Sequence, residues 1–299
     1  MTAHEGQGIN LEHRMDGRRM NGYNVEKDCL LEIRDLQVSY HKGKTAIGRN
    51  SGEPRAAVLD GVNLTVKKGC LTALLGVNGS GKTTLLKAAC GLIPFRSGGV
   101  TVCGRDLTAT RRRELASCIS YIPQKNSILY HIRTDEVVVM GANPRLCWYE
   151  APSAAHRREA RELLEQMGLL EEADRDFLTL SEGQKQLALL CRALMQNAPV
   201  MMFDEPDSAL DYGNRRMILS RISGIIREKK YGGLITIHDP DYALRYCDEI
   251  VILKDGRIRE TVYCRNGTEE GRKEAERKLR MIYPDLELLS FNGRFLTVK

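Results

Sequence analysis

The sequence predicts an α/β fold with a parallel sheet, a small antiparallel β subdomain and a helical subdomain. Three observations lead to this prediction. A buried strand, a glycine-rich loop and a helix follow one another between Leu71 and Cys90. The pattern from Lys125 to about Gln196 is helical, and residues 197–263 return to alternating strands and helices, as in a parallel α/β core. With 299 residues and 42% hydrophobic content, the chain can bury a sizeable core.

The glycine-rich loop matches the phosphate-binding pattern G-x-x-x-x-G-K-[ST] in full. The apolar run Leu71–Leu75 predicts the strand before it, and Thr83–Cys90 predicts the helix after it. In such a loop, backbone N–H groups surround phosphates, the lysine reaches the outer two phosphates and the threonine hydroxyl ligates magnesium. The alternative is a glycine-rich turn with a solvated lysine. The predicted nucleotide-binding residues of this P-loop are Gly76, Val77, Asn78, Gly79, Ser80, Gly81, Lys82, Thr83 and Thr84.

Periodicity and turn signals predict the remaining elements. Two antiparallel strands are expected on either side of the polar segment His41–Ala57. The expected helices outside the P-loop unit are Asp135–Gly141, Ala154–Met167, Gln186–Met195 and Glu269–Met281. Hairpins are expected at Lys254–Arg257 and about Asn292-Gly293. We therefore divide the chain into a disordered tail (1–28), a cassette (29–263, with a helical subdomain at about 125–196) and a C-terminal helix and hairpin (264–299).

The pentapeptide Leu180–Gln184 provides a second piece of phosphate chemistry. Ser181 is of the residue type favoured at a helix N-cap, and a helix N-terminus attracts phosphate through its unpaired N–H groups and partial positive charge. One chain does not need two such phosphate sites for one nucleotide. In this arrangement the sequence resembles the ABC-type ATPases, in which each subunit caps the ATP bound by its partner. The resemblance covers roughly Leu30 to Tyr263.

This resemblance implies an ABC ATPase cassette with a P-loop NTPase core, which hydrolyses ATP with Mg²⁺ as a cofactor and dimerises with ATP. Asp204 ends the apolar strand Val200–Phe203 and would hold magnesium, and Glu205 would be the general base for the attacking water. Tyr40 would stack on adenine, although a lone tyrosine is more often a core residue. The implied catalytic residues are Glu205, His238, Gln124 and Lys82, and the implied metal ligands are Thr83, Gln124 and Asp204. The implied nucleotide contacts outside the P-loop are Tyr40, Ser181, Gly183, Gln184 and Asp211.

Two features depart from the family pattern. The signature has Glu182 where glycine is usual and Leu187 where a basic residue is usual. Glu182 suits the positive end of a helix but lies close to a phosphate, so we expect slower or altered turnover rather than loss of activity. The segment His41–Ala57 separates Tyr40 from the strand that normally follows it closely. We interpret it as a surface insertion, which loop-closure entropy tolerates.

Composition is typical of a cytosolic enzyme. No apolar run approaches the roughly 20 residues needed to span a bilayer, and the polar N-terminus does not resemble a signal peptide. The nine cysteines are scattered without a C-x-x-C pair, so neither zinc nor a redox dithiol is indicated. The net charge of +6 is modest, and we interpret it as a solvated surface rather than as a nucleic-acid or membrane site.

Two classes of function remain open: the ATPase subunit of an importer, and a soluble ABC ATPase that acts on ribosomes or DNA. The chain has one P-loop and no long coiled coil, which favours the importer. The stretch Val137–Arg145 and the stretch Leu210–Asn214 resemble ATPases that import iron–siderophores, haem or cobalamin, although Met140-Gly141 could simply end a helix. Import of another metal ion or small solute is the alternative. The expected partners are a second copy of the chain, transmembrane permease subunits and a separate substrate-binding protein, with no nucleic acid. The expected location is the cytoplasmic face of the membrane, where the segment Asn126–Arg133 would help to receive a permease helix.

Overall fold

The computed structural model describes residues 28–39, 57–124, 128–147, 149–208, 210–264, 268–291 and 294–298. Several sequence predictions fall outside these residues: the tail up to residue 27, Tyr40, nearly all of the 41–57 insertion, and the first two residues of the segment Asn126–Arg133.

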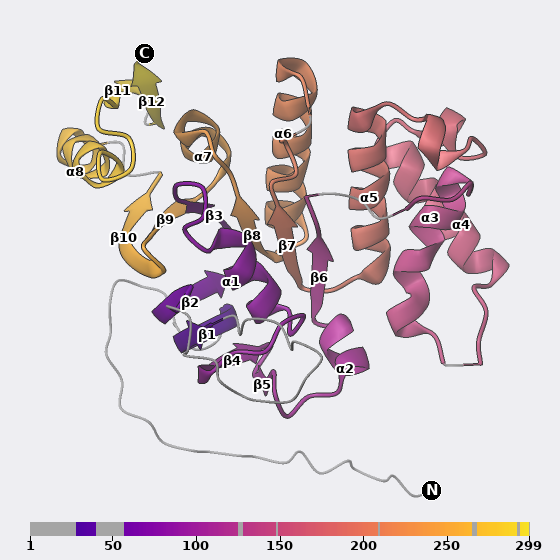
Figure 1. The fold of residues 1–299 in the computed structure, drawn as a ribbon. Coiled ribbons are helices and arrows are strands. Elements are labelled where there is room, and N and C mark those ends of the chain that lie inside the picture. Colours follow the sequence, from indigo (N-terminus) through magenta and orange to yellow (C-terminus); the bar gives the residue numbers. More distant parts are fainter. Residues whose placement is uncertain are drawn as a thin grey trace, which may run out of the picture.

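A six-stranded, mostly parallel sheet forms the centre of the molecule (Figure 1). Its strands lie in the order β10-β9-β3-β8-β7-β6, and only the β9–β10 pair is antiparallel. Strands β6, β7 and β8 are neighbours in both sequence and space, whereas β3, which leads into the P-loop, is inserted between β8 and β9. The strands are β3 (Leu71–Leu75), β6 (Ile119–Ile122), β7 (Val200–Asp204), β8 (Gly232–Thr236), β9 (Glu249–Lys254) and β10 (Arg257–Tyr263).

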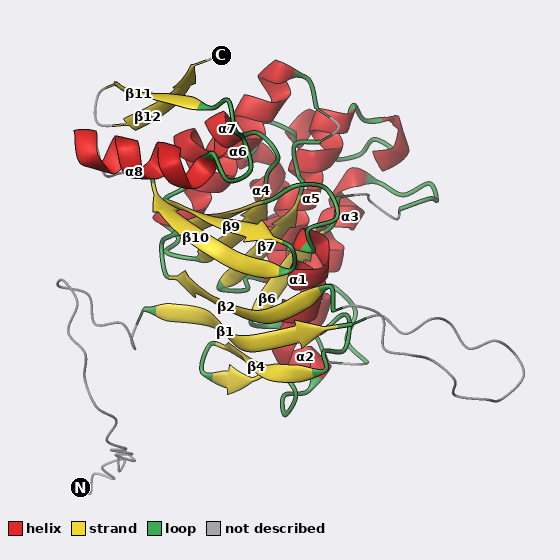
Figure 2. Cartoon of the chain, turned by 60° about the vertical axis from the view of Figure 1, so that its left-hand side comes forward, coloured by secondary structure: helices red, strands yellow, loops and turns green. Residues whose placement is uncertain are grey.

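A four-stranded antiparallel sheet lies below the central sheet in Figure 2 and has the order β2-β1-β4-β5. It confirms the predicted antiparallel β subdomain. Its strands are β1 (Cys29–Val38), β2 (Leu59–Lys67), β4 (Ser97–Val102) and β5 (Arg105–Asp106).

The helices α3, α4 and α5 gather at one side of the molecule, on the right of Figure 1. The α-helices are α1 (Lys82–Ala89), α2 (Arg112–Ala116), α3 (Thr134–Val139), α4 (Ala154–Gln166), α5 (Glu182–Gln196), α6 (Tyr212–Glu228), α7 (Pro240–Tyr246) and α8 (Glu269–Leu279). The 3₁₀ helices are η1 (Met140–Arg145), η2 (Leu170–Glu172) and η3 (Phe177–Thr179). The predicted helix Asp135–Gly141 therefore ends earlier as an α-helix, at Val139, and continues as a 3₁₀ turn.

The central sheet separates two hydrophobic cores because successive side chains of a strand point to opposite faces. In β7, Met201 and Phe203 contribute to the core shared with the helices, whereas Val200 and Met202 contribute to the core shared with α1 and the antiparallel sheet. All five residues of this strand are buried, as expected for a parallel strand covered on both faces.

Both predicted hairpins are present at the C-terminal end. Lys254 pairs with Arg257 across a turn in which Asp255 and Gly256 have φ values of 53° and 70°, as a tight two-residue hairpin requires. The strands β11 (Glu287–Phe291) and β12 (Arg294–Val298) pair in antiparallel fashion, although the turn between them lies outside the described residues.

Candidate functional site

The P-loop connects the carboxyl end of β3 to the start of α1. Gly79 and Gly81 have φ values of 81° and 104°, a region that favours glycine, so the loop can turn tightly before the helix. The ammonium group of Lys82 donates to the carbonyl oxygens of Gly76 at 2.8 Å and Val77 at 3.3 Å. Burial lowers the pKa of Lys82, and the charges of Glu205 and Asp204 act in the opposite direction. The lysine side chain therefore lies inside the P-loop and links two backbone carbonyl groups of the loop.

The other P-loop residues differ in exposure. Val77, Asn78 and Gly79 form the exposed rim of the loop, whereas Ser80 and Thr84 are buried. Ser80 Oγ has no hydrogen-bond partner among the described residues. A buried hydroxyl without a partner is costly, so a bound group with phosphate oxygens would satisfy it.

Asp204, at the end of β7, accepts three hydroxyl hydrogen bonds. Thr83 and Thr236 lie 3.0 and 3.1 Å from its Oδ1, and the Tyr121 hydroxyl lies 3.0 Å from its Oδ2. Burial raises the pKa of Tyr121, and the charge of Asp204 adds to this effect, so the phenol remains a donor. The carboxylate is therefore held in one orientation, with the Thr83 hydroxyl beside it.

Glu205 follows directly and is held from two sides. Gln124 Nε2 donates to its Oε2 at 2.5 Å, and His238 Nε2 lies 2.5 Å from its Oε1. Its own backbone N–H donates to the Thr236 hydroxyl at 2.7 Å, and its φ of 48° is unusual for a residue other than glycine. Gln124 follows β6, Glu205 follows β7 and His238 follows β8, and these strands are adjacent in the sheet. The carboxyl ends of parallel strands thus bring the three predicted catalytic side chains together.

The Thr83 hydroxyl and the Asp204 carboxylate fit a magnesium ion. Mg²⁺ prefers oxygen ligands and is commonly held by one or two protein groups together with substrate phosphates. Both oxygens are in place, 3.0 Å apart, next to the loop expected to hold phosphate. Gln124, the third predicted ligand, is directed to Glu205 in this structure.

The second predicted phosphate site lies at the start of α5. Ser181 is its N-cap, with Oγ accepting from the backbone N–H of Gln184 at 3.3 Å, and the Gln184 side chain accepts from the Ser181 N–H at 3.0 Å. This is the capping box that places backbone donors at a helix start. Glu182, the departure from the family pattern, forms an ion pair with Lys185 at 2.8 Å. The carboxylate is thereby partly neutralised within its own helix.

Asp211, at the start of α6, is linked to the start of α5 by the side chain of Asn214. Asp211 caps α6 by accepting from the Asn214 backbone N–H at 2.9 Å and from its side chain at 2.8 Å. These hydrogen bonds lower the pKa of Asp211. A Cβ atom on Gly183 would lie 3.0 Å from the Asn214 side chain, so the two helix starts are in close contact.

Two residues of the site were not identified from the sequence: Tyr121 and Thr236. Tyr121 lies on β6 and Thr236 on β8, three and two positions before the identified residues Gln124 and His238. The sequence signal that could have identified both residues is a polar side chain near the carboxyl end of a buried parallel strand.

Comparisons with known proteins agree with this geometry. The sequence profile described as ABC transporter matches residues 59–208. An iron chelatin transport ATP-binding protein of Helicobacter pylori is 35% identical over 230 residues, which cover 77% of this chain and 85% of that protein. The chain belongs to the ABC transporter family. A hemin import ATP-binding protein of Bordetella pertussis is 37% identical to this ABC ATPase over 211 residues, covering 68% of this chain and 79% of the relative.

Solved structures of ABC proteins share the fold. A chain of a metal-chelate type ABC transporter in an inward-facing conformation has a TM-score of 0.71 at 21% identity, covering 91% of this chain and 98% of that chain. A dimeric ATP-binding cassette bound to ADP and Pi has a TM-score of 0.66 at 25% identity, covering 78% and 98%. The predicted ABC ATPase cassette is confirmed. Among the described residues, no helix combines the length and apolar character needed to cross a membrane.

Proposed function

We propose that this ABC ATPase is the ATP-hydrolysing subunit of an importer that takes up a metal chelate of the iron–siderophore, haem or cobalamin class through separate permease subunits. The names of its relatives support the cargo class, since iron chelatin and hemin transport ATP-binding proteins match most of the chain. The ATPase residues themselves do not contact cargo in such an arrangement. Import of another metal ion or small solute is the alternative.

One observation carries the proposed chemistry: the Glu205 carboxylate is held between Gln124 and His238 at the tip of β7. A carboxylate fixed by two neighbours is positioned to accept a proton from an attacking water. Lys82 and the loop N–H groups would hold the outer phosphates, and His238 would stabilise charge on the transferring phosphoryl group. Phosphoryl transfer requires mainly such positioning and electrostatic stabilisation.

Magnesium would be held by the Thr83 hydroxyl and by Asp204, with Gln124 as a further ligand when it leaves Glu205. The bound ion supplies charge neutralisation on the phosphates. The hydroxyls of Tyr121 and Thr236 keep the Asp204 carboxylate oriented toward Thr83. The adenine platform assigned to Tyr40 lies outside the described residues and stays a prediction.

A second copy of the chain would complete the nucleotide site. Ser181, Gly183 and Gln184 at the start of α5 would bind the γ-phosphate of ATP held by the partner, and Asp211 would lie at the same interface. The capping box at Ser181 fixes the start of α5, and the close approach of Gly183 to Asn214 places the start of α6 beside it; both observations support this proposal. The dimeric cassette among the similar structures supports it too.

A groove of about 300 Å³ in the helical subdomain is the proposed docking place for a permease helix. Its walls come from α3, η1, α4 and the chain before α4, and Ile132 and Arg133 also line it. Leu129 and Tyr130, which precede these residues in the chain, are exposed at 84% and 56%, so two adjacent apolar side chains are available to a partner there. This arrangement would place the protein at the cytoplasmic face of the membrane, next to the permease and with a separate substrate-binding protein on the other side.

The decisive experiment is Glu205→Gln. This change keeps the size and most of the hydrogen bonding of the side chain but removes the base, so hydrolysis should fall roughly 100-fold or more. ATP binding should remain, because Lys82, Thr83 and the loop N–H groups are unchanged. Phosphate release in the presence of permease, together with equilibrium ATP binding, measures both quantities. The matched variant Lys82→Ala should show the opposite pattern, with weak ATP binding. Parental hydrolysis by Glu205→Gln would mean that another group is the base.

A further inference from the structure

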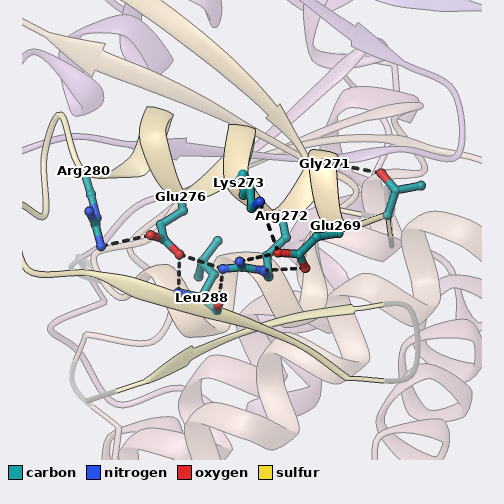
Figure 3. Close-up of polar contacts among 8 residues, drawn as sticks. Glu269, Gly271, Arg272, Lys273, Glu276, Arg280 and Leu288 are labelled. Atoms are coloured by element: carbon teal, nitrogen blue, oxygen red, sulfur yellow. Dashed lines mark hydrogen bonds and ion pairs between the residues drawn. The ribbon is translucent and has the colours of Figure 1, made fainter.

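The C-terminal extension, residues 269–298, is built as one unit from α8 and the β11–β12 pair. Arg272 on α8 donates to the Leu288 carbonyl at 2.7 Å, and the Glu276 carboxylate accepts from the Leu288 backbone N–H at 3.0 Å (Figure 3). Arg280, one turn further on, donates to the Leu286 carbonyl at 2.8 Å. Charged side chains of the helix therefore hold the incoming strand along its backbone.

This unit is also anchored to the ATPase core. Leu279 and Phe295 are almost completely buried and belong to the same hydrophobic core as the central sheet. Lys278 donates to the Thr261 carbonyl of β10 at 2.9 Å. The extension therefore packs against the ATPase core through buried side chains and a hydrogen bond to β10.

The extension contacts both ends of a four-residue segment, 238–241, which we term the switch segment. The Tyr283 hydroxyl donates to the backbone carbonyl of His238. At the other end, the Thr297 hydroxyl donates to the Asp241 carboxylate at 3.3 Å, with the Thr297 backbone N–H at 3.5 Å from the same oxygen. The switch segment leads from β8 into α7, whose N-cap Asp239 accepts from the Asp241 N–H at 2.9 Å.

We propose that Tyr283 is a positioning residue for ATP hydrolysis: its hydroxyl fixes the backbone of His238 and thereby the imidazole beside Glu205. The inference rests on the proposed role of His238. It extends the catalytic apparatus beyond the cassette, because Tyr283 comes from the C-terminal extension. Thr297 supports the same segment from its far end.

Two physical facts support this role. Burial, followed by the charge of Asp239, raises the pKa of Tyr283 to about 12, so the phenol keeps its proton and donates throughout the physiological pH range. The imidazole of His238 lies 2.5 Å from the Glu205 carboxylate, so a small displacement of the His238 backbone alters a short contact at the reacting centre. Catalytic geometry tolerates such displacements poorly.

The test is Tyr283→Phe in the full-length protein, with Tyr231→Phe as a matched control. The control removes another tyrosine hydroxyl hydrogen bond, the one to Asn197 at 2.7 Å, away from the switch segment. Loss of one neutral hydrogen bond corresponds to about a two- to tenfold change. We expect Tyr283→Phe to lower kcat for ATP by this factor with KM and ATP affinity unchanged, and the control to keep the parental kcat.

A double-mutant cycle separates positioning from general destabilisation. If Tyr283 acts through His238, adding Tyr283→Phe to His238→Ala should cause no further loss of kcat. A second variant, Thr297→Val, should also lower kcat, because it removes the other hydroxyl contact to the switch segment. Melting temperatures of all variants show that the folded protein is being compared.

The outcomes distinguish this inference from the proposed function. If His238→Ala lowers kcat but Tyr283→Phe turns over ATP at the parental rate, the positioning role is wrong and the assignment of His238 survives. An equal loss from Tyr283→Phe in the parent and in His238→Ala would also overturn the positioning role. If His238→Ala itself retains the parental rate, the proposed role of His238 fails, and the inference fails with it.

Discussion

Glu182 places a carboxylate in the first turn of α5, where the proposed function requires a phosphate to bind. Its partner Lys185 has a largely buried side chain, 16% exposed, and lies 2.8 Å away. The helix start therefore carries an internal ion pair instead of an unopposed negative charge. The Glu182 side chain is 53% exposed, so solvent weakens the contribution of the pair to stability, and the pair matters mainly for the charge that a partner's ATP would meet.

We predict that Lys185→Met weakens the response to ATP. The unpaired Glu182 carboxylate would repel the γ-phosphate of the partner's nucleotide, so the ATP concentration for half-maximal hydrolysis should rise by roughly threefold to tenfold, as expected for about 1 kcal/mol of repulsion at partial solvent exposure. Steady-state hydrolysis at low ionic strength measures this change. Because salt screens exposed charges, the difference should shrink at 1 M salt.

Two comparisons test the cause of this effect. The double variant Glu182→Gln/Lys185→Met has no carboxylate and should regain the parental response. Lys273→Met removes another helix lysine that faces a glutamate, Glu269 on α8, with a longer contact of 4.0 Å at the opposite side of the molecule, and should leave hydrolysis unchanged (Figure 1). A persistent defect in the double variant would show that Lys185 acts other than by neutralising Glu182.

At the scale of elements, Gly141 decides how closely η1 packs against α5. A Cβ atom at this position would collide with the backbone carbonyl of Arg192 and would lie 2.8 Å from the Cβ of Met195. Backbone cannot move aside as a flexible side chain can. The sequence left open whether Met140-Gly141 marks a family of importers or merely ends a helix. The structure adds a packing role beside the groove proposed for the permease.

We predict that Gly141→Ala lowers the free energy of unfolding by about 1–3 kcal/mol, the usual cost of overpacking a close contact. Urea denaturation followed by circular dichroism measures it. Gly224→Ala is the matched control, because Gly224 lies inside α6 and an added Cβ would meet nothing within 4 Å. That change should raise the free energy of unfolding by about 0.5–1 kcal/mol through helix propensity. Equal stability of Gly141→Ala and the parent would contradict the close-packing argument.

At the scale of the whole molecule, one hydrophobic core joins the helical subdomain, the central sheet and the C-terminal extension. Val138 of α3, Phe203 of β7 and Phe295 of β12 all belong to it. The predicted division at residue 264 therefore separates two segments of the chain, but side chains from both segments pack into the same core.

We predict that ATP and magnesium convert the chain into a closed homodimer. The Glu205→Gln protein, in which ATP persists, should double its mass by light scattering when ATP and magnesium are added. Adding Ser181→Arg should prevent this, because a bulky side chain would stand where the partner's phosphate binds. ATP binding at Lys82 should be retained.

Ser181→Arg also removes a helix cap, so it needs a control with the same loss. Ser153 is the N-cap of α4 and forms a capping box with His156. Ser153→Arg in the Glu205→Gln background should therefore lose capping stability too but still dimerise. Dimerisation of both variants would refute the head-to-tail arrangement.

Local sequence was sufficient to predict the structural features that depend on residues close together in the chain. The strand–loop–helix unit of the P-loop, the adjacent Asp204 and Glu205 at a strand end, the Ser181 cap and the Asp255-Gly256 turn were all predictable. Each arises from backbone preferences or hydrogen bonds within a few positions. The roles of Gln124 and His238 came from the resemblance to a family.

Tertiary structure decided which of these groups meet. Gln124 and Glu205 are 81 residues apart in the chain, and they touch only because β6 and β7 are neighbours in the sheet. The hydroxyls of Tyr121 and Thr236 on Asp204, and that of Tyr283 on the His238 carbonyl, depend on the same strand order and on the docking of the C-terminal extension. Strand order is set by the burial of entire faces, which no short sequence pattern encodes.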